Sequence, residues 1–166
     1  MVDRDHAAIV EYIVGRLRLW GWEVRLEYGF NHYGDRGSVD ILAWHPGERV
    51  LLIIEVKSRL TDLQDMLNSL GRKMRVVPPI VARDGRAPVA TGCLLAILGT
   101  TANRRVVAQH PQTFSATFPD RGADVIRRLR RPTDPLRGLW FVAPRTIVGV
   151  RRQRVRPQAE PLPPAE

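Results

Sequence analysis

Two acidic residues and a lysine interrupt apolar stretches of the sequence, where a charged side chain is costly. Asp40 lies within the apolar run 39–43, and Glu55 and Lys57 directly follow the apolar run 50–54. A charge left in an apolar interior costs several kcal/mol, so such groups persist where they pair, bind a metal ion or do chemistry. These three residues are therefore the first candidates for a functional site.

The spacing of the three residues predicts that they share one face of a β-hairpin. Side chains alternate along a strand, so Glu55 and Lys57 point to the same side and Val56 to the other. Residues 45–49, which include a proline and a glycine, predict a turn that places Asp40 opposite Glu55. Two opposed carboxylates repel unless a cation lies between them, and an all-oxygen site favours Mg²⁺ over zinc. Lys57 would then stand beside the metal ion.

These residues carry a resemblance to a known family. Residues 37–40 (Gly-Ser-Val-Asp), the fourteen residues that follow, and Glu55-Val56-Lys57 resemble the signature of the PD-(D/E)XK nuclease superfamily. Residues 30–45 are also similar to a group of uncharacterised bacterial domains that often follow helix-turn-helix regulators. The resemblance extends over residues 3–142, and its diagnostic part is residues 30–57.

The resemblance implies a fold, a reaction and a set of roles. The fold is α/β with a restriction-endonuclease-like core: a helix, a three-stranded antiparallel meander, a second helix and a further strand in a mixed sheet flanked by helices. The implied function is Mg²⁺- or Mn²⁺-dependent endonucleolytic hydrolysis of DNA phosphodiester bonds. Asp40, Glu55 and the backbone carbonyl of Val56 would ligate the metal ion, and Lys57 would orient the attacking water or neutralise developing charge. The superfamily also suggests Glu11 on the first helix and Gln64 on the second as site residues.

Each role has a simpler alternative. Glu55 and Lys57 could form an ion pair at a strand end, with Asp40 capping a neighbouring turn. Glu11 could be a solvated helix residue. Glu27 competes with it for the same role from the polar face of the first strand, and Asp35 in the predicted turn could reach the cleft. Residues 61–64 (Thr-Asp-Leu-Gln) fit a capping box, which would occupy Gln64. A catalytically silent nuclease fold that only binds nucleic acid or regulates transcription is the alternative function.

The charge of the chain favours an anionic partner. Its formal net charge is +9, and arginine supplies nearly all of the excess because only two lysines are present. Arginine suits phosphate, so DNA is the expected partner and RNA stays open, whereas GC-rich coding sequence would also enrich arginine. Candidate nucleic-acid contacts are Arg36, Arg59, Lys73, Arg127, Arg128 and Arg131, although the last three also suit a solvated helix face.

The remaining pattern predicts the elements that hold the site. Apolar spacing predicts helices over residues 3–19 and 61–77, the second limited by Pro78 and Pro79. Alternation predicts a strand over residues 22–30, followed by a turn at 34–37. Continuous apolar character predicts a buried, parallel-type strand over 90–98. Further helices are expected at 104–109 and 122–130, and a last strand at 139–142.

Length and composition predict one domain over residues 1–144. Residues 145–166, rich first in arginine and then in proline, are expected to form a disordered tail. No secretion leader or membrane-spanning run is evident, and the single cysteine allows no disulfide within the chain, so a cytoplasmic protein is expected. A homodimer is a further expectation from the superfamily.

Overall fold

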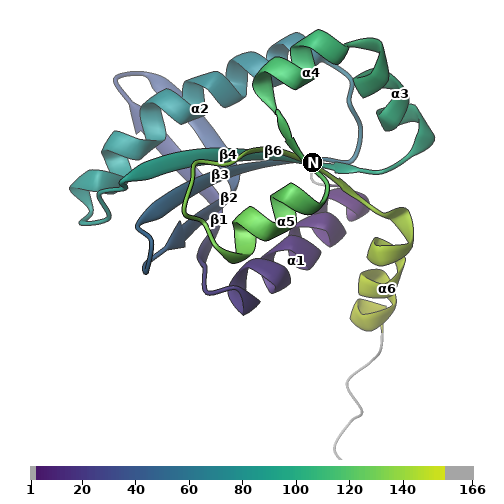
Figure 1. Ribbon diagram of the computed structural model, residues 1–166, viewed down its shortest axis with the longest axis horizontal. Coiled ribbons are helices and arrows are strands. Elements are labelled where there is room, and N and C mark those ends of the chain that lie inside the picture. The colour runs from purple at the N-terminus through teal and green to yellow at the C-terminus, as the bar shows by residue number, and fades with distance from the viewer. Residues whose placement is uncertain (1–2, 156–166) are drawn as a thin grey trace, which may run out of the picture.

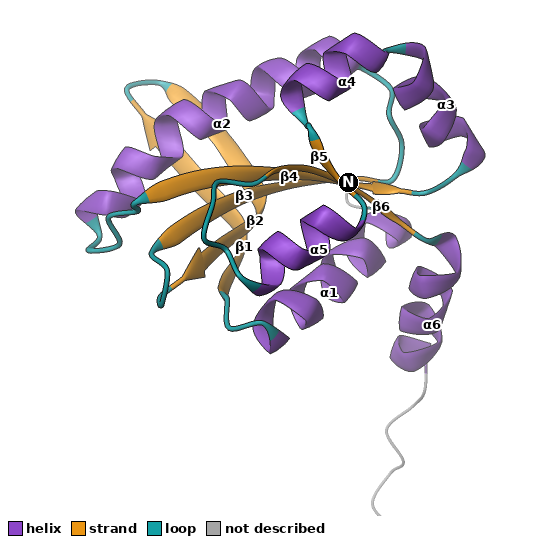
Figure 2. Ribbon diagram, viewed as in Figure 1, coloured by secondary structure: helices purple, strands orange, loops and turns teal. Residues whose placement is uncertain are grey.

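The computed structural model describes residues 3–155 and contains one six-stranded mixed sheet with helices on both faces (Figure 1; Figure 2). The strands lie in the order β1-β2-β3-β4-β6-β5; β1, β2 and β3 are antiparallel, and β3, β4, β6 and β5 are parallel. The elements are α1 (Arg4–Leu19), β1 (Glu23–His32), β2 (Asp35–His45), β3 (Val50–Lys57), α2 (Leu63–Arg83), β4 (Ala90–Leu98), α3 (Thr101–Gln109), α4 (Pro111–Thr117), β5 (Asp120–Arg121), α5 (Ala123–Arg130), β6 (Arg137–Val142) and α6 (Pro144–Val155). The α/β class and the mixed sheet flanked by helices are as expected.

Each face of the sheet has its own apolar core. Helices α1 and α5 cover one face, and α2, α3 and α4 cover the other (Figure 1). On the α1 face, Ile9 and Ile13 pack against alternate strand residues such as Leu52 and Ile54. On the α2 face, the interleaved strand residues, Ile53 among them, meet the apolar stripe of α2. Strand β3 is buried on both faces, which explains its continuous apolar run.

The hairpin of β2 and β3 has the predicted register. Leu42 pairs with Ile53 and Trp44 pairs with Leu51, and the turn lies between His45 and Val50. The ladder ends at the pair Ile41 and Ile54, one residue before Asp40 and Glu55. The two acidic residues therefore lie where the strands stop pairing.

The first hairpin turn differs from the prediction. The turn lies at Tyr33 and Gly34, both with positive φ (50° and 87°), and β2 begins already at Asp35. Two residues with positive φ form the tight turn whose twist matches the flanking strands, so the turn needs only two residues. Asp35 is consequently a strand residue opposite His32, at the far end of the hairpin.

The alternation of side chains breaks at Glu27 in β1 and at Asp40 in β2. Val24 packs on the α1 face, whereas Tyr28, also at an even position, packs on the α2 face; Ile41 and Val39 differ in the same way. Glu27 has a φ of 47°, and Glu27 and Asp40 are missing from an otherwise continuous ladder. The register is the same on both sides of this unpaired position, so the side chains of both strands change face here without an extra residue. Asp40 therefore lies at the change of face.

Helix α2 does not stop before Pro78 and Pro79, as the sequence suggested, but runs through both to Arg83. A proline inside a helix costs about 3 kcal/mol because it removes a hydrogen bond and crowds the preceding turn. The buried residues Val76, Val77 and Val81 continue the apolar stripe on either side of the prolines, and each contributes roughly 1.5–3 kcal/mol. Tertiary burial thus outweighs the local penalty.

The expected tail is also corrected in part. Residues 145–155 belong to α6, because Ile147 is buried in the core beside α1. Residues 156–166, the rest of that tail, lie outside the described residues. No helix within residues 3–155 combines the length and the apolar character needed to cross a membrane.

Candidate active site

The side chains predicted to form the site line one cavity. This cavity has a volume of about 360 Å³ and lies at the end of β3, between the first turns of α1 and the first half of α2. Asp40, Glu55 and Lys57 line it together, as predicted, although the alternation that was expected to bring Asp40 there is interrupted at that residue; His6 and Lys73 also line it. The cavity is therefore lined by both lysines of the chain and by four carboxylates, those of Asp40 and Glu55 and those of Asp3 and Asp65.

Asp40 is held by a backbone amide and by a histidine. Its Oδ2 accepts a hydrogen bond of 2.8 Å from the N–H of Val56, a donor that the shortened β2–β3 ladder leaves available. The Nε2 of His6 lies 3.5 Å from the same oxygen. Burial disfavours the charged form of Asp40, but His6 and the Val56 amide outweigh it and lower the pKa of Asp40. The carboxylate is thus stabilised as an anion.

Glu55 has the opposite electrostatic environment. Its side chain is almost fully buried on β3, and its Oε1 accepts a hydrogen bond from the equally buried ammonium of Lys73 on α2. Burial raises the pKa of Glu55 although the charge of Lys73 acts in the other direction, and the nearby Asp40 carboxylate adds to the increase. Lys73 is therefore a buried part of the site and not the exposed nucleic-acid contact that the sequence suggested.

Lys57 is half-buried and shares the cavity with Glu55. Its ammonium group has no hydrogen-bond or ion-pair partner among the described residues. The alternative in which Lys57 is the ion-pair partner of Glu55 is therefore wrong, since Lys73 takes that position. Lys57 is a cation directed to a solvent-accessible cavity.

The first turn of α1 is tied to the chain that follows β3. Asp3 caps α1 by accepting a hydrogen bond from the N–H of His6, and its second oxygen accepts one of 2.6 Å from the hydroxyl of Ser58. The hydrogen bond from Ser58 lowers the pKa of Asp3. These contacts fix His6 beside Asp40.

The additional candidates Glu11, Glu27, Gln64 and Asp35 do not line this cavity. Glu11 and Glu27 line a second cavity of about 580 Å³, which shares only His6 and Asp40 with the first. Gln64 is exposed on α2, where its side-chain amide donates to Asn68. The predicted capping box is wrong, because Asp62 and not Thr61 caps α2. Asp35 lies at the hairpin tip, away from the cavity.

The candidate arginines fall into separate regions. Arg59 is exposed and lines the cavity, and Arg36 is exposed on β2 near the hairpin tip. Arg127, Arg128 and Arg131 line a cavity of about 830 Å³ beside α5. The last turn of α5 lies at the end of α1 remote from His6, since Arg130 covers the ring of Trp20, the C-cap of α1. A 16-residue helix is roughly 24 Å long, so the α5 arginines do not surround the site.

The donor atoms suit a hard divalent cation. Within residues 3–155, no three His, Cys, Asp or Glu side chains are grouped to hold a metal ion. Mg²⁺ commonly takes only one or two carboxylates and completes its shell with water and substrate phosphate. Asp40 is kept anionic and Lys73 occupies one oxygen of Glu55, so the oxygen donors left for such an ion are Asp40, the other Glu55 oxygen and the Val56 carbonyl.

The contact between His6 and Asp40 predicts a pH dependence of stability. Asp40 raises the pKa of His6 above its usual 6.5, so the folded protein holds the proton more tightly than the unfolded chain. The stability from this contact is complete below pH 6.5 and is lost as the pH rises through the folded-state pKa. We expect the urea midpoint in EDTA to fall more between about pH 6 and 8 for the wild type than for His6→Asn. His32→Asn, at the hairpin tip, is the control; equal pH dependence of wild type and His6→Asn would contradict the expectation.

Sequence reasoning missed His6 as a site residue and assigned Lys73 a different role, that of a nucleic-acid contact. No spacing marks His6, which reaches Asp40 only through the packing of α1 on the sheet. Lys73 did carry a signal, because it falls at helical spacing among Met66, Leu70 and Val77, which are all buried. A lysine on an apolar stripe indicates a buried partner.

Comparison with known proteins leaves this site to be interpreted from its own chemistry. The sequence matches no protein-family model, and a search of curated proteins finds no significantly similar sequence.

Proposed function

We propose that this protein is a metal-dependent endonuclease that hydrolyses phosphodiester bonds of DNA. The observation that carries the proposal is the convergence of Asp40, Glu55 and Lys57 on one open cavity at the end of a buried strand. A cavity lined by several carboxylates and by a lysine without a partner among the described residues has the groups needed for phosphoryl chemistry. The resemblance to the PD-(D/E)XK superfamily supports the same interpretation.

Asp40, Glu55 and the backbone carbonyl of Val56 would hold the Mg²⁺ or Mn²⁺ ion. When bound, the ion supplies Lewis-acid stabilisation of phosphate charge and a more acidic water. His6 and the Val56 amide orient Asp40 and keep it ionised, and Lys73 orients Glu55. The site is therefore preorganised by groups that are themselves held by packing.

Lys57 and Arg59 are assigned to the substrate. Lys57 would orient the attacking water or neutralise charge that develops on the scissile phosphate, because it lines the same cavity as both carboxylates. Arg59 is exposed at the cavity and suits a neighbouring phosphate. The net charge of +9 would attract a polyanion such as DNA.

Incubation with nucleic acid tests the proposal. We expect nicking or linearisation of supercoiled plasmid with Mg²⁺ or Mn²⁺ and none with EDTA. Asp40→Asn keeps the size of the side chain and serves as the control for contaminating nuclease. Single-stranded and branched DNA and RNA of matched sequence identify the substrate class. Absence of metal-dependent cleavage of every substrate would contradict the proposal.

One observation favours a second function, a nuclease fold that binds nucleic acid or regulates transcription without catalysis. The ammonium of Lys73 occupies an oxygen of Glu55 that a metal ion would need. A buried ion pair costs several kcal/mol to separate, so this contact would oppose metal binding. Salt-sensitive DNA binding, with no cleavage and no binding of Mn²⁺ by calorimetry, would support this alternative over the endonuclease.

A further inference from the structure

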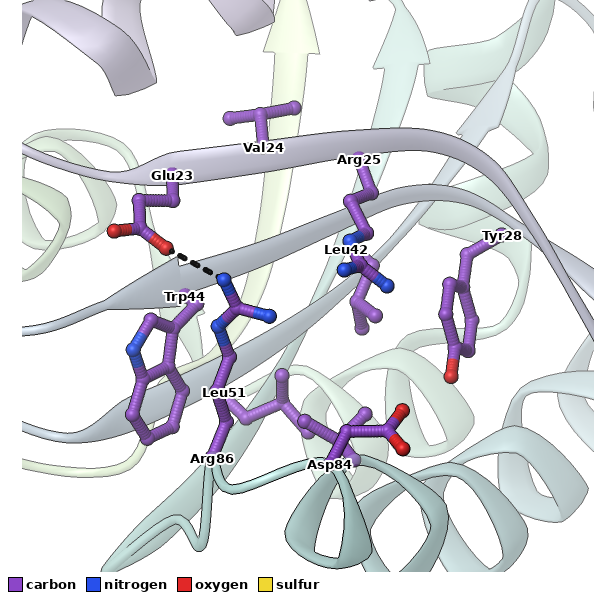
Figure 3. A pocket seen from close by; sticks show the side chains of 10 residues that line it. Glu23, Val24, Arg25, Tyr28, Leu42, Trp44, Leu51, Asp84 and Arg86 are labelled. Carbon is purple, nitrogen blue, oxygen red and sulfur yellow. Dashed lines mark hydrogen bonds and ion pairs between the residues drawn. The ribbon is translucent and has the colours of Figure 1, made fainter.

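A second, smaller pocket lies at the other end of α2. It has a volume of about 140 Å³ and is formed by β1, the end of β2, the start of β3 and the last turn of α2 (Figure 3). None of its lining residues lines the Asp40 cavity. Glu55 is four residues from Leu51 along β3, so the two sites are roughly 13 Å apart along the strand.

The floor and walls of this pocket suit a flat, apolar ring. Leu42 and Leu51 form an apolar floor, and the half-buried side chains of Trp44 and Tyr28 stand at either side (Figure 3). Val81 of α2 is a further apolar lining residue. An engineered cavity of about 150 Å³ in another protein holds one benzene molecule, whereas drug-sized ligands need about 300 Å³ or more. The pocket therefore encloses about one six-membered ring, and a fused two-ring system would extend beyond its rim.

The rim of the pocket carries groups of both charges. Glu23 and Arg86 neutralise each other through a contact of 3.2 Å, drawn as the dashed line in Figure 3. Arg25 and Asp84 have no ion-pair partner among the described residues, although Arg25 lies 6.0 Å from the centre of the Tyr28 ring. Figure 3 shows Arg25, Tyr28 and Asp84 directed toward the same space. The guanidinium of Arg25 and the carboxylate of Asp84 are thus available to bind a ligand.

We propose that this pocket binds a single unpaired guanine base, stacked on Trp44 or Tyr28 and recognised by Asp84 and Arg25. Guanine presents two adjacent N–H groups on its pairing edge, which match the two acceptor oxygens of a carboxylate. Its O6 and N7 are acceptors that an arginine contacts in a bidentate manner. A base that carries donors on one edge and acceptors on the next fits the Asp84 and Arg25 pair.

The other bases fit this rim less well. Adenine presents an acceptor nitrogen where guanine has an N–H, so it would face the carboxylate of Asp84 with a lone pair. Pyrimidines offer a smaller stacking surface and no counterpart of the N7 acceptor. The inference is independent of the proposed hydrolysis, because it uses no residue of the Asp40 cavity.

Isothermal titration calorimetry in EDTA tests the proposal. One arm compares guanosine and adenosine 5′-monophosphates, and the other compares oligothymidylates that carry one central deoxyguanosine or deoxyadenosine. We expect the guanine ligand to bind about tenfold more tightly than its adenine counterpart in at least one arm, and Asp84→Asn to remove that preference. The arm with the tighter binding identifies the source of the base. Asp134→Asn, an exposed carboxylate beside α5, is the matched control.

Three outcomes decide the matter. Loss of the guanine preference in Asp84→Asn and weaker binding in Arg25→Gln support the pocket. Equal affinity for guanine and adenine in both arms, or an unchanged preference in Asp84→Asn, overturns it. The Lys57→Ala variant separates the two proposals, because Lys57 does not line this pocket. The variant should bind the guanine ligand with wild-type affinity, whether or not the wild-type protein cleaves DNA.

Discussion

Lys73→Met is expected to destabilise the protein by about 3–5 kcal/mol near pH 8, the largest change in stability that we predict. The substitution leaves the carboxylate of Glu55 buried in the sheet without its cation. Methionine has nearly the shape of the lysine stem, so the loss reports on the missing charge rather than on a cavity. Urea unfolding followed by circular dichroism measures the effect.

The pH dependence of this effect follows from the pKa of Glu55. Burial raises that pKa above the ordinary 4.5. As the pH falls, Glu55 therefore takes up a proton at a higher pH in the folded protein than in the unfolded chain. Stability therefore falls as the pH rises from 4.5 through the folded-state pKa. Removal of Lys73 removes an interaction that lowers this pKa, so the fall becomes larger and extends to higher pH. The loss in Lys73→Met should accordingly be smaller at pH 5 than at pH 8.

Two further variants test whether the effect of Lys73→Met comes from the broken ion pair. The double variant Glu55→Leu with Lys73→Met replaces both charges by apolar groups and should be about as stable as the wild type. Lys57→Met removes the other lysine of the cavity, which has no ion-pair partner among the described residues, and should cost less than about 1 kcal/mol. A double variant as unstable as Lys73→Met alone would show that the ion pair is not the cause.

Lys57→Ala is expected to slow metal-dependent cleavage of DNA by roughly 10²–10³-fold while the free energy of unfolding hardly changes. Lys57 is the lysine of the cavity that is not bound to a carboxylate, so its ammonium is available to the substrate. The loss of one preorganised charge at a developing negative charge typically has this size. Single-turnover cleavage at saturating protein measures the rate of the chemical step.

The neighbouring Arg59 gives the matched comparison. Arg59→Ala removes an exposed charge at the same cavity and should weaken DNA binding and reduce its salt dependence by about one counterion. Its cleavage rate at saturation should stay close to that of the wild type. If Lys57→Ala cleaves at the wild-type rate, or if both variants lose only affinity, the assigned role of Lys57 is wrong.

Local sequence rules were enough for the centre of the candidate site. The turn between residues 45 and 50 and the alternation of side chains set the hairpin register, and the observed pairs Leu42 with Ile53 and Trp44 with Leu51 agree with it. Glu55 and Lys57 line one cavity because strand parity has a period of two residues, and Asp40 lines it too although the alternation is interrupted at that residue. A short turn between neighbouring strands fixes which residues pair, so few other registers of this hairpin are possible.

The elements beyond that hairpin depended on packing. A proline pair predicts the end of a helix, but the burial of Val77 and Val81 carries α2 through Pro78 and Pro79. The arginine-rich segment predicts a disordered tail. Its first part instead forms helix α6, in which Ile147 is buried in the core beside α1. In both cases the deciding energy comes from contacts between residues far apart in the sequence, which local propensity does not contain.

The sequence by itself therefore determined the α/β class, the hairpin and the three residues that point into one cavity. Only the tertiary structure decided which groups hold those residues. Lys73 lies on α2 and His6 on α1, and each reaches its carboxylate because the two helices pack on opposite faces of the sheet. The physical reason is that alternation and turns act over a few residues, whereas the pairing of a buried charge depends on how whole layers of the fold come together.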